Sequence, residues 1–116
     1  MKPLADPQVL ACFRQVLANW NVTDYVTAKD VALEWAGKNC AGFSLKALAR
    51  VMYDHLQAGG EIDQVRETRR EWNDRDYHYD FRLAFAGRLL YIETILVDDD
   101  PRDPTVHIVS IHDAGT

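Results

Sequence analysis

The histidines of this sequence are its clearest candidates for acid–base chemistry, because imidazole exchanges protons near neutral pH. His78 lies in an alternating segment, and His107 and His112 lie five positions apart in the closing segment TVHIVSIHDA. Residues five apart on a regular strand point to opposite faces, so these two cannot form one acid–base pair without a bulge or a bend. Of the two, His112 beside Asp113 is the better catalytic candidate.

A single carboxylate, Glu93, interrupts the apolar segment RLLYIETILVD at residues 88–98. It follows Tyr91 on the same face of the strand that this segment predicts. A carboxylate in such surroundings either pairs with a cation or acquires a raised pKa. We expect an ion pair, with Arg82 or Arg88 as the partner.

An acidic cluster follows this segment in DDDPRDP, residues 98–104. Its carboxylates are Asp98, Asp99, Asp100 and Asp103. The cluster lacks the regular ligand spacing and the glycine bend of calcium loops, and glycine-rich phosphate loops and zinc-type Cys/His spacings are absent from the chain. We therefore expect no metal and no cofactor. The cluster is either a solvated loop or, together with Trp72, a surface for a basic protein partner.

Basic and polar side chains share one face of the helix expected after Ser44. They are Lys46, Arg50, Tyr53 and Gln57, spaced at i, i+4, i+7 and i+11. Lysine and arginine can contact phosphates or guanine, and glutamine can contact adenine. The alternative is an ordinary solvated helix face. Arg69 and Arg70 lie among acidic residues, and they either contact a DNA backbone or neutralise their neighbours.

Composition limits the function classes. The 116 residues carry a net charge of −5, and residues 61–116 hold thirteen acidic but only seven basic side chains. Such a field argues against indiscriminate phosphate binding. No apolar stretch is long enough for a membrane helix, and the start shows no secretory signal. Cys12 and Cys40 have no CxxC spacing, so we expect reduced, buried thiols in a cytoplasmic protein.

Periodicity predicts an α+β protein. Helices should follow the N-caps Asp6, Thr27 and Ser44, each before an apolar stripe at helical spacing. Alternation predicts strands over 61–70, 77–85, 88–98 and 105–112, with a tight turn at Ala86-Gly87. We expect one domain of 116 residues, in which a three-helix unit (1–60) precedes an antiparallel sheet of three or four strands (61–116).

Two segments resemble known families. Residues 26–65, VTAKDVALEWAGKNCAGFSLKALARVMYDHLQAGGEIDQV, resemble a winged helix-turn-helix domain. The resemblance implies that the helix after Ser44 enters the major groove of DNA and that the protein pairs as a homodimer. The closing segments GRLLYIET and TVHIVSIHDA are similar to the last strands of RelE-like ribonuclease toxins. That similarity implies acid–base cleavage of RNA by His78, His107 or His112.

We therefore expect a small, non-enzymatic DNA-binding regulator first. The second hypothesis is a protein-binding inhibitor or adaptor, of the kind that mobile elements encode, which uses its acidic half against a basic partner. The third is a RelE-like ribonuclease.

Overall fold

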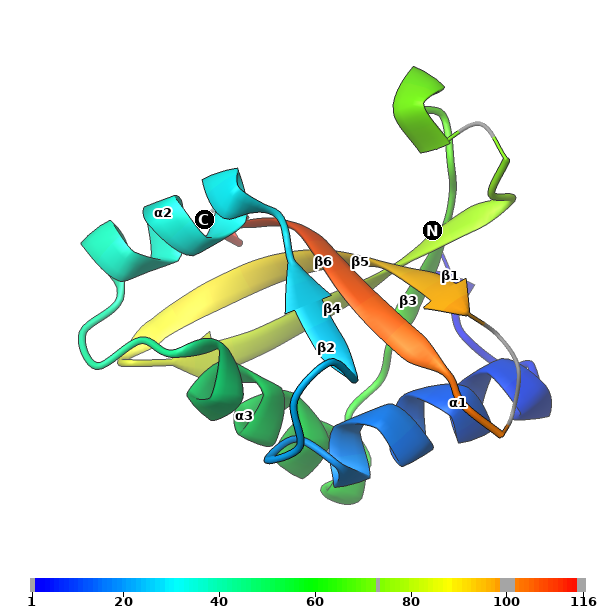
Figure 1. The fold of residues 1–116 in the computed structure, drawn as a ribbon, viewed down its shortest axis with the longest axis horizontal. Helices are drawn as coiled ribbons and strands as arrows, with labels where there is room; N and C mark the ends of the chain where they lie inside the picture. Colours follow the sequence, from blue (N-terminus) through cyan, green and yellow to red (C-terminus); the bar gives the residue numbers. More distant parts are fainter. Residues whose placement is uncertain (1, 73, 99–101, 115–116) are drawn as a thin grey trace.

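A mixed six-stranded sheet forms the centre of the protein (Figure 1). The computed structural model describes residues 2–72, 74–98 and 102–114. In chain order the elements are β1 (Lys2–Pro3), α1 (Pro7–Ala18), β2 (Val26–Ala28), α2 (Asp30–Asn39), α3 (Leu45–Gln57), β3 (Asp63–Arg66), the 3-10 turn η1 (Arg70–Trp72), β4 (Tyr77–Phe85), β5 (Arg88–Asp98) and β6 (Thr105–Asp113). The strand order is β1-β3-β4-β5-β6-β2, and only β2 runs parallel to its neighbour, β6.

The predicted α+β class and its three helices are confirmed, but the sheet has six strands rather than three or four. The two additional strands, β1 and β2, come from the first 28 residues and contain two and three residues. Strands this short do not show a period-2 pattern. The exposed strand expected over 61–70 also shortens to the four residues of β3.

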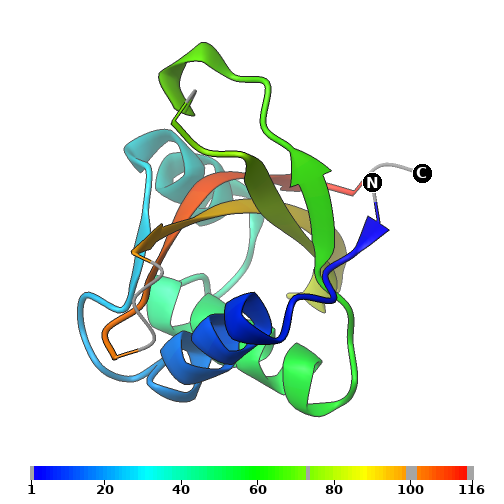
Figure 2. The ribbon, with the colours of Figure 1, turned by 90° about the vertical axis from the view of Figure 1, so that its right-hand side faces the viewer.

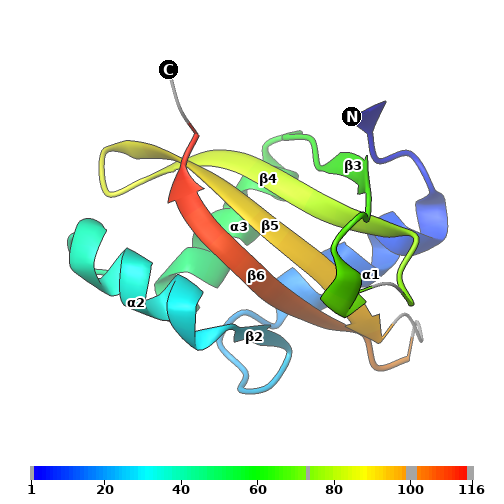
Figure 3. The same ribbon diagram turned by 90° about the horizontal axis from the view of Figure 1, so that it is seen from above.

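Helices α1 and α3 cover one face of the curved sheet (Figure 2). Between these helices and the sheet lies the apolar core, in which Phe13 of α1 contacts the rings of Tyr79 and Phe81 on β4. Helix α2 lies beside β6, at the β2 edge (Figure 3). We call the face that α1 and α3 leave uncovered the outer face.

Two of the three expected helix caps are confirmed. The side chains of Asp6 and Ser44 accept hydrogen bonds from backbone N–H groups of the first turns of α1 and α3. The expected cap at Thr27 is wrong, because Thr27 lies in β2 and Lys29 precedes α2. The pairing of β2 with β6 directs the Thr27 hydroxyl to His107 Nδ1, at 2.8 Å.

A β-bulge in β6 decides where the two closing histidines point. Ser110 pairs with Glu93 and Ile108 pairs with Thr94, so Val109 is one extra residue on β6. The extra residue shifts the alternation by one position. His107, paired with Ile95, and His112, paired with Tyr91, therefore both lie on the outer face. Two histidines five positions apart can share a face only if the strand is irregular between them, and the bulge at Val109 is that irregularity.

Core packing leads to a stability prediction. Phe13 has no exposed surface, whereas Val31 on α2 is 61% exposed. Phe13→Ala should lower the free energy of unfolding by about 3–5 kcal/mol, because it removes buried area and leaves a cavity between α1 and β4. The control, Val31→Ala, should change it by less than about 1 kcal/mol. Urea unfolding followed by circular dichroism measures both values, and similar losses for the two variants would contradict this core.

The environment of His107 leads to a pH prediction. Burial, with a smaller effect of Lys29, lowers the pKa of His107 below its ordinary value of 6.5. Below about pH 6.5, His107 binds a proton in the unfolded chain more readily than in the folded protein, so the free energy of unfolding falls as the pH drops. The wild type should lose more unfolding free energy between about pH 7.5 and 5.5 than His107→Gln does. Equal pH dependence of the two proteins in urea unfolding would refute this assignment.

Candidate active site

Polar and ionisable side chains of β4, β5 and β6 lie together on the outer face of the sheet. The strands contribute His78, Asp80, Arg82, Tyr91, Glu93, Ser110 and His112. The pairing places Asp80 opposite Glu93, Glu93 opposite Ser110, and Tyr91 between Arg82 and His112. The expected alternation in β4 is confirmed, since Tyr79 and Phe81 join the core while Asp80 belongs to this group. Strand pairing thus builds one polar cluster from three chain segments.

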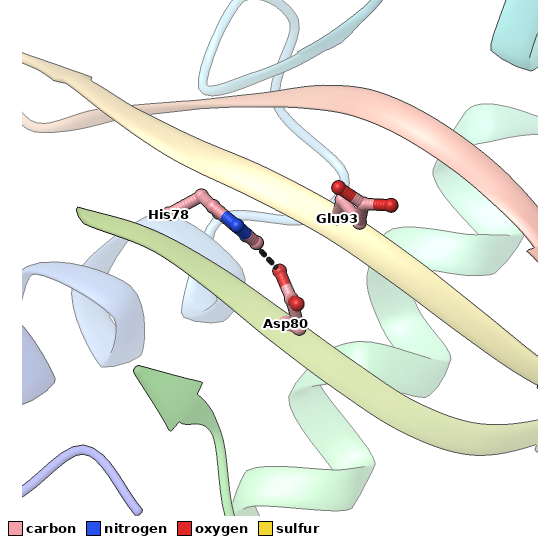
Figure 4. A group of neighbouring side chains, drawn as sticks. All are labelled: His78, Asp80 and Glu93. Atoms are coloured by element: carbon pink, nitrogen blue, oxygen red, sulfur yellow. Dashed lines mark hydrogen bonds and ion pairs between the residues drawn. The ribbon is translucent and has the colours of Figure 1, made fainter. Parts of the chain in front are cut away.

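Asp80 is the buried centre of this cluster, with no exposed side-chain surface. Its Oδ1 lies 2.7 Å from His78 Nδ1 (Figure 4). Its Oδ2 accepts a hydrogen bond from the Tyr91 hydroxyl. Burial raises the pKa of Asp80, although both hydrogen bonds oppose the shift. Burial and the bond to Asp80 also raise the pKa of Tyr91, which therefore stays a proton donor. Asp80 accordingly fixes the orientation of the His78 and Tyr91 side chains.

Glu93 and His112 form the accessible part of the cluster. Glu93 Oε1 lies 3.4 Å from His112 Nε2, and Glu93 Oε2 accepts a hydrogen bond of 3.0 Å from Arg69 Nη1. The side chain of Glu93 is 22% exposed and that of His112 is 49% exposed. A carboxylate and an imidazole this close, both open to solvent, can take and give a proton on the same small molecule or polymer.

The ring of His112 has a defined orientation. It stacks on Tyr91 with ring centres 5.2 Å apart, and Arg82 lies over the Tyr91 ring at 5.3 Å. His112 Nδ1 lies 3.0 Å from the backbone carbonyl of Asp113 and must donate to it, because a carbonyl only accepts. The proton that His112 gains and loses is therefore the one on Nε2, the atom that faces Glu93.

The described residues between β3 and β4, 67–72 and 74–76, cross the outer face, and we call them the strap. Arg69 donates to both Glu67 carboxylate oxygens at 2.8 Å. This contact lowers the pKa of Glu67 and raises that of Arg69. Farther along, Arg75 donates to the backbone carbonyls of Leu96 and Val97, each at 3.0 Å. The strap thus reaches from β3 across to β5.

Glu93 does have a cationic partner, but it is neither of those expected. Arg69 occupies that role, while Arg82 Nε lies 3.6 Å from Asp63 and Arg88 pairs with Asp113 at 2.7 Å. Arg69 lies 24 positions before Glu93, so no local pattern indicates the pair. The alternation of β4 indicates that Asp80 lies on the same polar face as His78, and this pattern is the feature of the sequence that could have identified Asp80 as a site residue.

The residues expected to contact DNA lie mostly on α3, which packs on the other face of the sheet. Lys46, Arg50 and Gln57 are exposed, and Tyr53 is half-buried against the core. The Arg50 guanidinium lies over the Trp20 ring at 5.3 Å. Of the two strap arginines, Arg69 belongs to the outer-face cluster and Arg70 is exposed in η1.

Three of the residues expected to contact a protein partner, Trp72, Asp98 and Asp103, lie within the described residues. Trp72 folds back against the ring of His107, at a centre distance of 6.0 Å. Asp98 at the end of β5 and Asp103 before β6 are exposed. Asp99 and Asp100 lie outside the described residues.

Three side chains of metal-ligand type lie close together on the outer face. Ligand atoms of His78, Asp80 and Glu93 lie within 4.8 Å of one another (Figure 4). A cation there would break the hydrogen bond between His78 and Asp80, and it would approach the positive Arg69 guanidinium that already contacts Glu93. Proton transfer requires neither change, so the present arrangement suits acid–base chemistry better.

Comparisons of the chain with family models, curated proteins and solved structures found no match. Within the described residues, no helix is long and apolar enough to cross a membrane. The winged-helix and RelE-like resemblances consequently stay predictions. Functional proposals for this chain rest on the geometry of its own residues.

Proposed function

We propose that the outer face cleaves RNA phosphodiester bonds, with Glu93 as the general base and His112 as the general acid. The observation that supports this most is the separation of 3.4 Å between Glu93 Oε1 and His112 Nε2, with both side chains open to solvent. Both residues also belong to the segments GRLLYIET and TVHIVSIHDA, which are similar to RelE-like ribonuclease toxins.

The proposed reaction uses the 2′-hydroxyl of RNA as the nucleophile. The Glu93 carboxylate removes the proton of this hydroxyl, and the oxygen attacks the adjacent phosphorus. The bond from phosphorus to the 5′-oxygen breaks, and His112 Nε2 donates its proton to that oxygen. The products are a 2′,3′-cyclic phosphate and a 5′-hydroxyl. Glu93 is then protonated and His112 neutral, and solvent restores both.

Two guanidinium groups near the pair can contact a phosphate, and each of them also has carboxylate neighbours. The Arg69 guanidinium contacts Glu93, and Arg82 lies on the far side of the Tyr91 ring. Preorganised cations stabilise the negative charge that grows on the phosphate oxygens in the transition state. The acidic second half supplies no long-range attraction for RNA. Binding therefore depends on these local contacts.

Cleavage of single-stranded RNA by the purified protein, with EDTA present, tests the proposal. Glu93→Gln and His112→Ala should each slow cleavage by at least about 100-fold, because each removes one proton-transfer group. Glu34, an exposed residue of α2, and His55 of α3 provide the controls Glu34→Gln and His55→Gln, which should keep the rate. Mass spectrometry of the products should show the cyclic phosphate. An inactive wild type, or equal losses in the controls, would contradict the proposal.

A second candidate function is DNA binding through α3, which Lys46 and Arg50 favour. Both side chains are exposed and lie one helical turn apart. Neither has an acidic partner among the residues that the structure describes. Unpaired cations on an exposed helix can contact DNA phosphates.

A gel-shift titration with duplex DNA at low salt tests this second candidate. Lys46→Glu and Arg50→Glu should weaken binding by about ten-fold or more, because each replaces a phosphate contact with a repulsion. Lys38→Glu, which changes an exposed lysine of α2, is the charge-matched control and should keep wild-type affinity. Absence of a shift with wild-type protein, or an equal effect of the control, would exclude this use of α3.

A further inference from the structure

Three buried side-chain atoms in the described residues have no hydrogen-bond partner, and all three belong to the strap or to the sheet strand β6. They are Trp72 Nε1, Arg75 Nε and Ser110 Oγ. Buried polar groups in folded proteins almost always have a partner, so each exception needs an explanation. The exception at Arg75 is explained, because its terminal nitrogens donate to two carbonyls and its Nε lies 3.9 Å from the Asp74 carboxylate. The exceptions at Trp72 and Ser110 still need an explanation.

Ser110 lies beside the proposed catalytic pair. It is the strand partner of Glu93, and it precedes His112 by two residues on the same face of β6. The bulge at Val109 ends immediately before it, so the register that brings His112 to the outer face also brings Ser110 there. Its hydroxyl can donate one hydrogen bond, but no acceptor among the described residues receives it.

Trp72 is the corresponding group on the strap. Its ring packs against His107, whose strand partner is the fully buried Ile95, so the ring covers the sheet near the other end of the outer face. The indole N–H can only donate, and it too finds no acceptor. The indole N–H is a donor only, and the Ser110 hydroxyl can donate as well as accept. Both groups lie on the side of the sheet that bears the proposed catalytic pair.

We propose that Ser110 and Trp72 bind the backbone of single-stranded RNA, with Ser110 Oγ donating to the phosphate that Glu93 and His112 act on and Trp72 Nε1 donating to a flanking backbone oxygen. The assignment rests on the proposed ribonuclease function. Phosphate oxygens are charged acceptors that satisfy such donors strongly. RNA reaches these buried donors only when the strap moves, which breaks the side-chain contacts that Arg69 and Arg75 make with β5.

A purely structural role predicts that removing either donor lowers the melting temperature, whereas an unpartnered group that serves RNA predicts no such loss. An unpartnered buried hydroxyl destabilises the fold, so Ser110→Ala should raise or preserve the melting temperature. Trp72→Phe likewise removes the N–H while keeping a ring against His107. If the two donors serve RNA, these stable variants should nevertheless bind RNA less well. Retained stability with lost binding is the signature of a functional group.

The test measures the affinity for a fluorescent 2′-O-methyl oligoribonucleotide, which cannot be cleaved through its 2′-oxygen, by fluorescence anisotropy. Ser110→Ala and Trp72→Phe should each weaken binding by about ten-fold, the loss expected for one hydrogen bond to a charged group. Thr68→Ala removes an exposed hydroxyl from the strap, and Trp35→Phe changes a tryptophan of α2, so both controls should keep wild-type affinity.

The remaining outcomes overturn either the binding assignment or the proposed catalysis. Unchanged affinity of a variant, or a melting temperature that drops with affinity, assigns that donor a structural role. No binding by the wild type refutes both donors together. If the wild type binds the analogue and the two variants bind it weakly, but the wild type cleaves no RNA, the binding assignment stands and the proposed catalysis fails.

Discussion

The register between β5 and β6 is the constraint on which the outer face depends. One extra residue, Val109, separates the partners of Glu93 and Thr94. Without it, the residues on one side of position 109 would exchange faces, because a one-residue shift inverts the orientation of every side chain that follows. With it, apolar residues still point to the core on both sides of the bulge, while His107, Ser110 and His112 all point outward.

The two faces of the sheet contribute to the stability of the fold in opposite ways. The inner face stabilises the fold by burying aromatic and aliphatic side chains against α1 and α3. The outer face buries polar groups, which costs free energy unless each finds a partner. Hydrogen bonds with His78 and Tyr91 offset this cost for Asp80, and the hydrogen bonds from Arg69 offset it for Glu67. The raised pKa of Asp80 shows that its compensation is incomplete, and such perturbed groups cluster at functional sites.

Much of the architecture was predictable, because hydrophobic period reports which face of an element is buried. The caps at Asp6 and Ser44, the three helices and the strands β4, β5 and β6 follow from it. Strands β1 and β2 did not, because two or three residues carry no period. In the candidate site, His112 and Glu93 were singled out separately. Their contact was not predicted, because strand pairing joins residues nineteen positions apart.

The amino-acid sequence by itself determined the α+β class, the polar side of β4 and the identity of the histidines and Glu93 as candidate chemistry. These properties depend on composition and local spacing. Only the tertiary structure decided that Arg69 is the partner of Glu93, that Thr27 bonds His107 and that both closing histidines share a face. Each depends on which segments pair and in what register, and a bulge of one residue changes the outcome without a recognisable local signal.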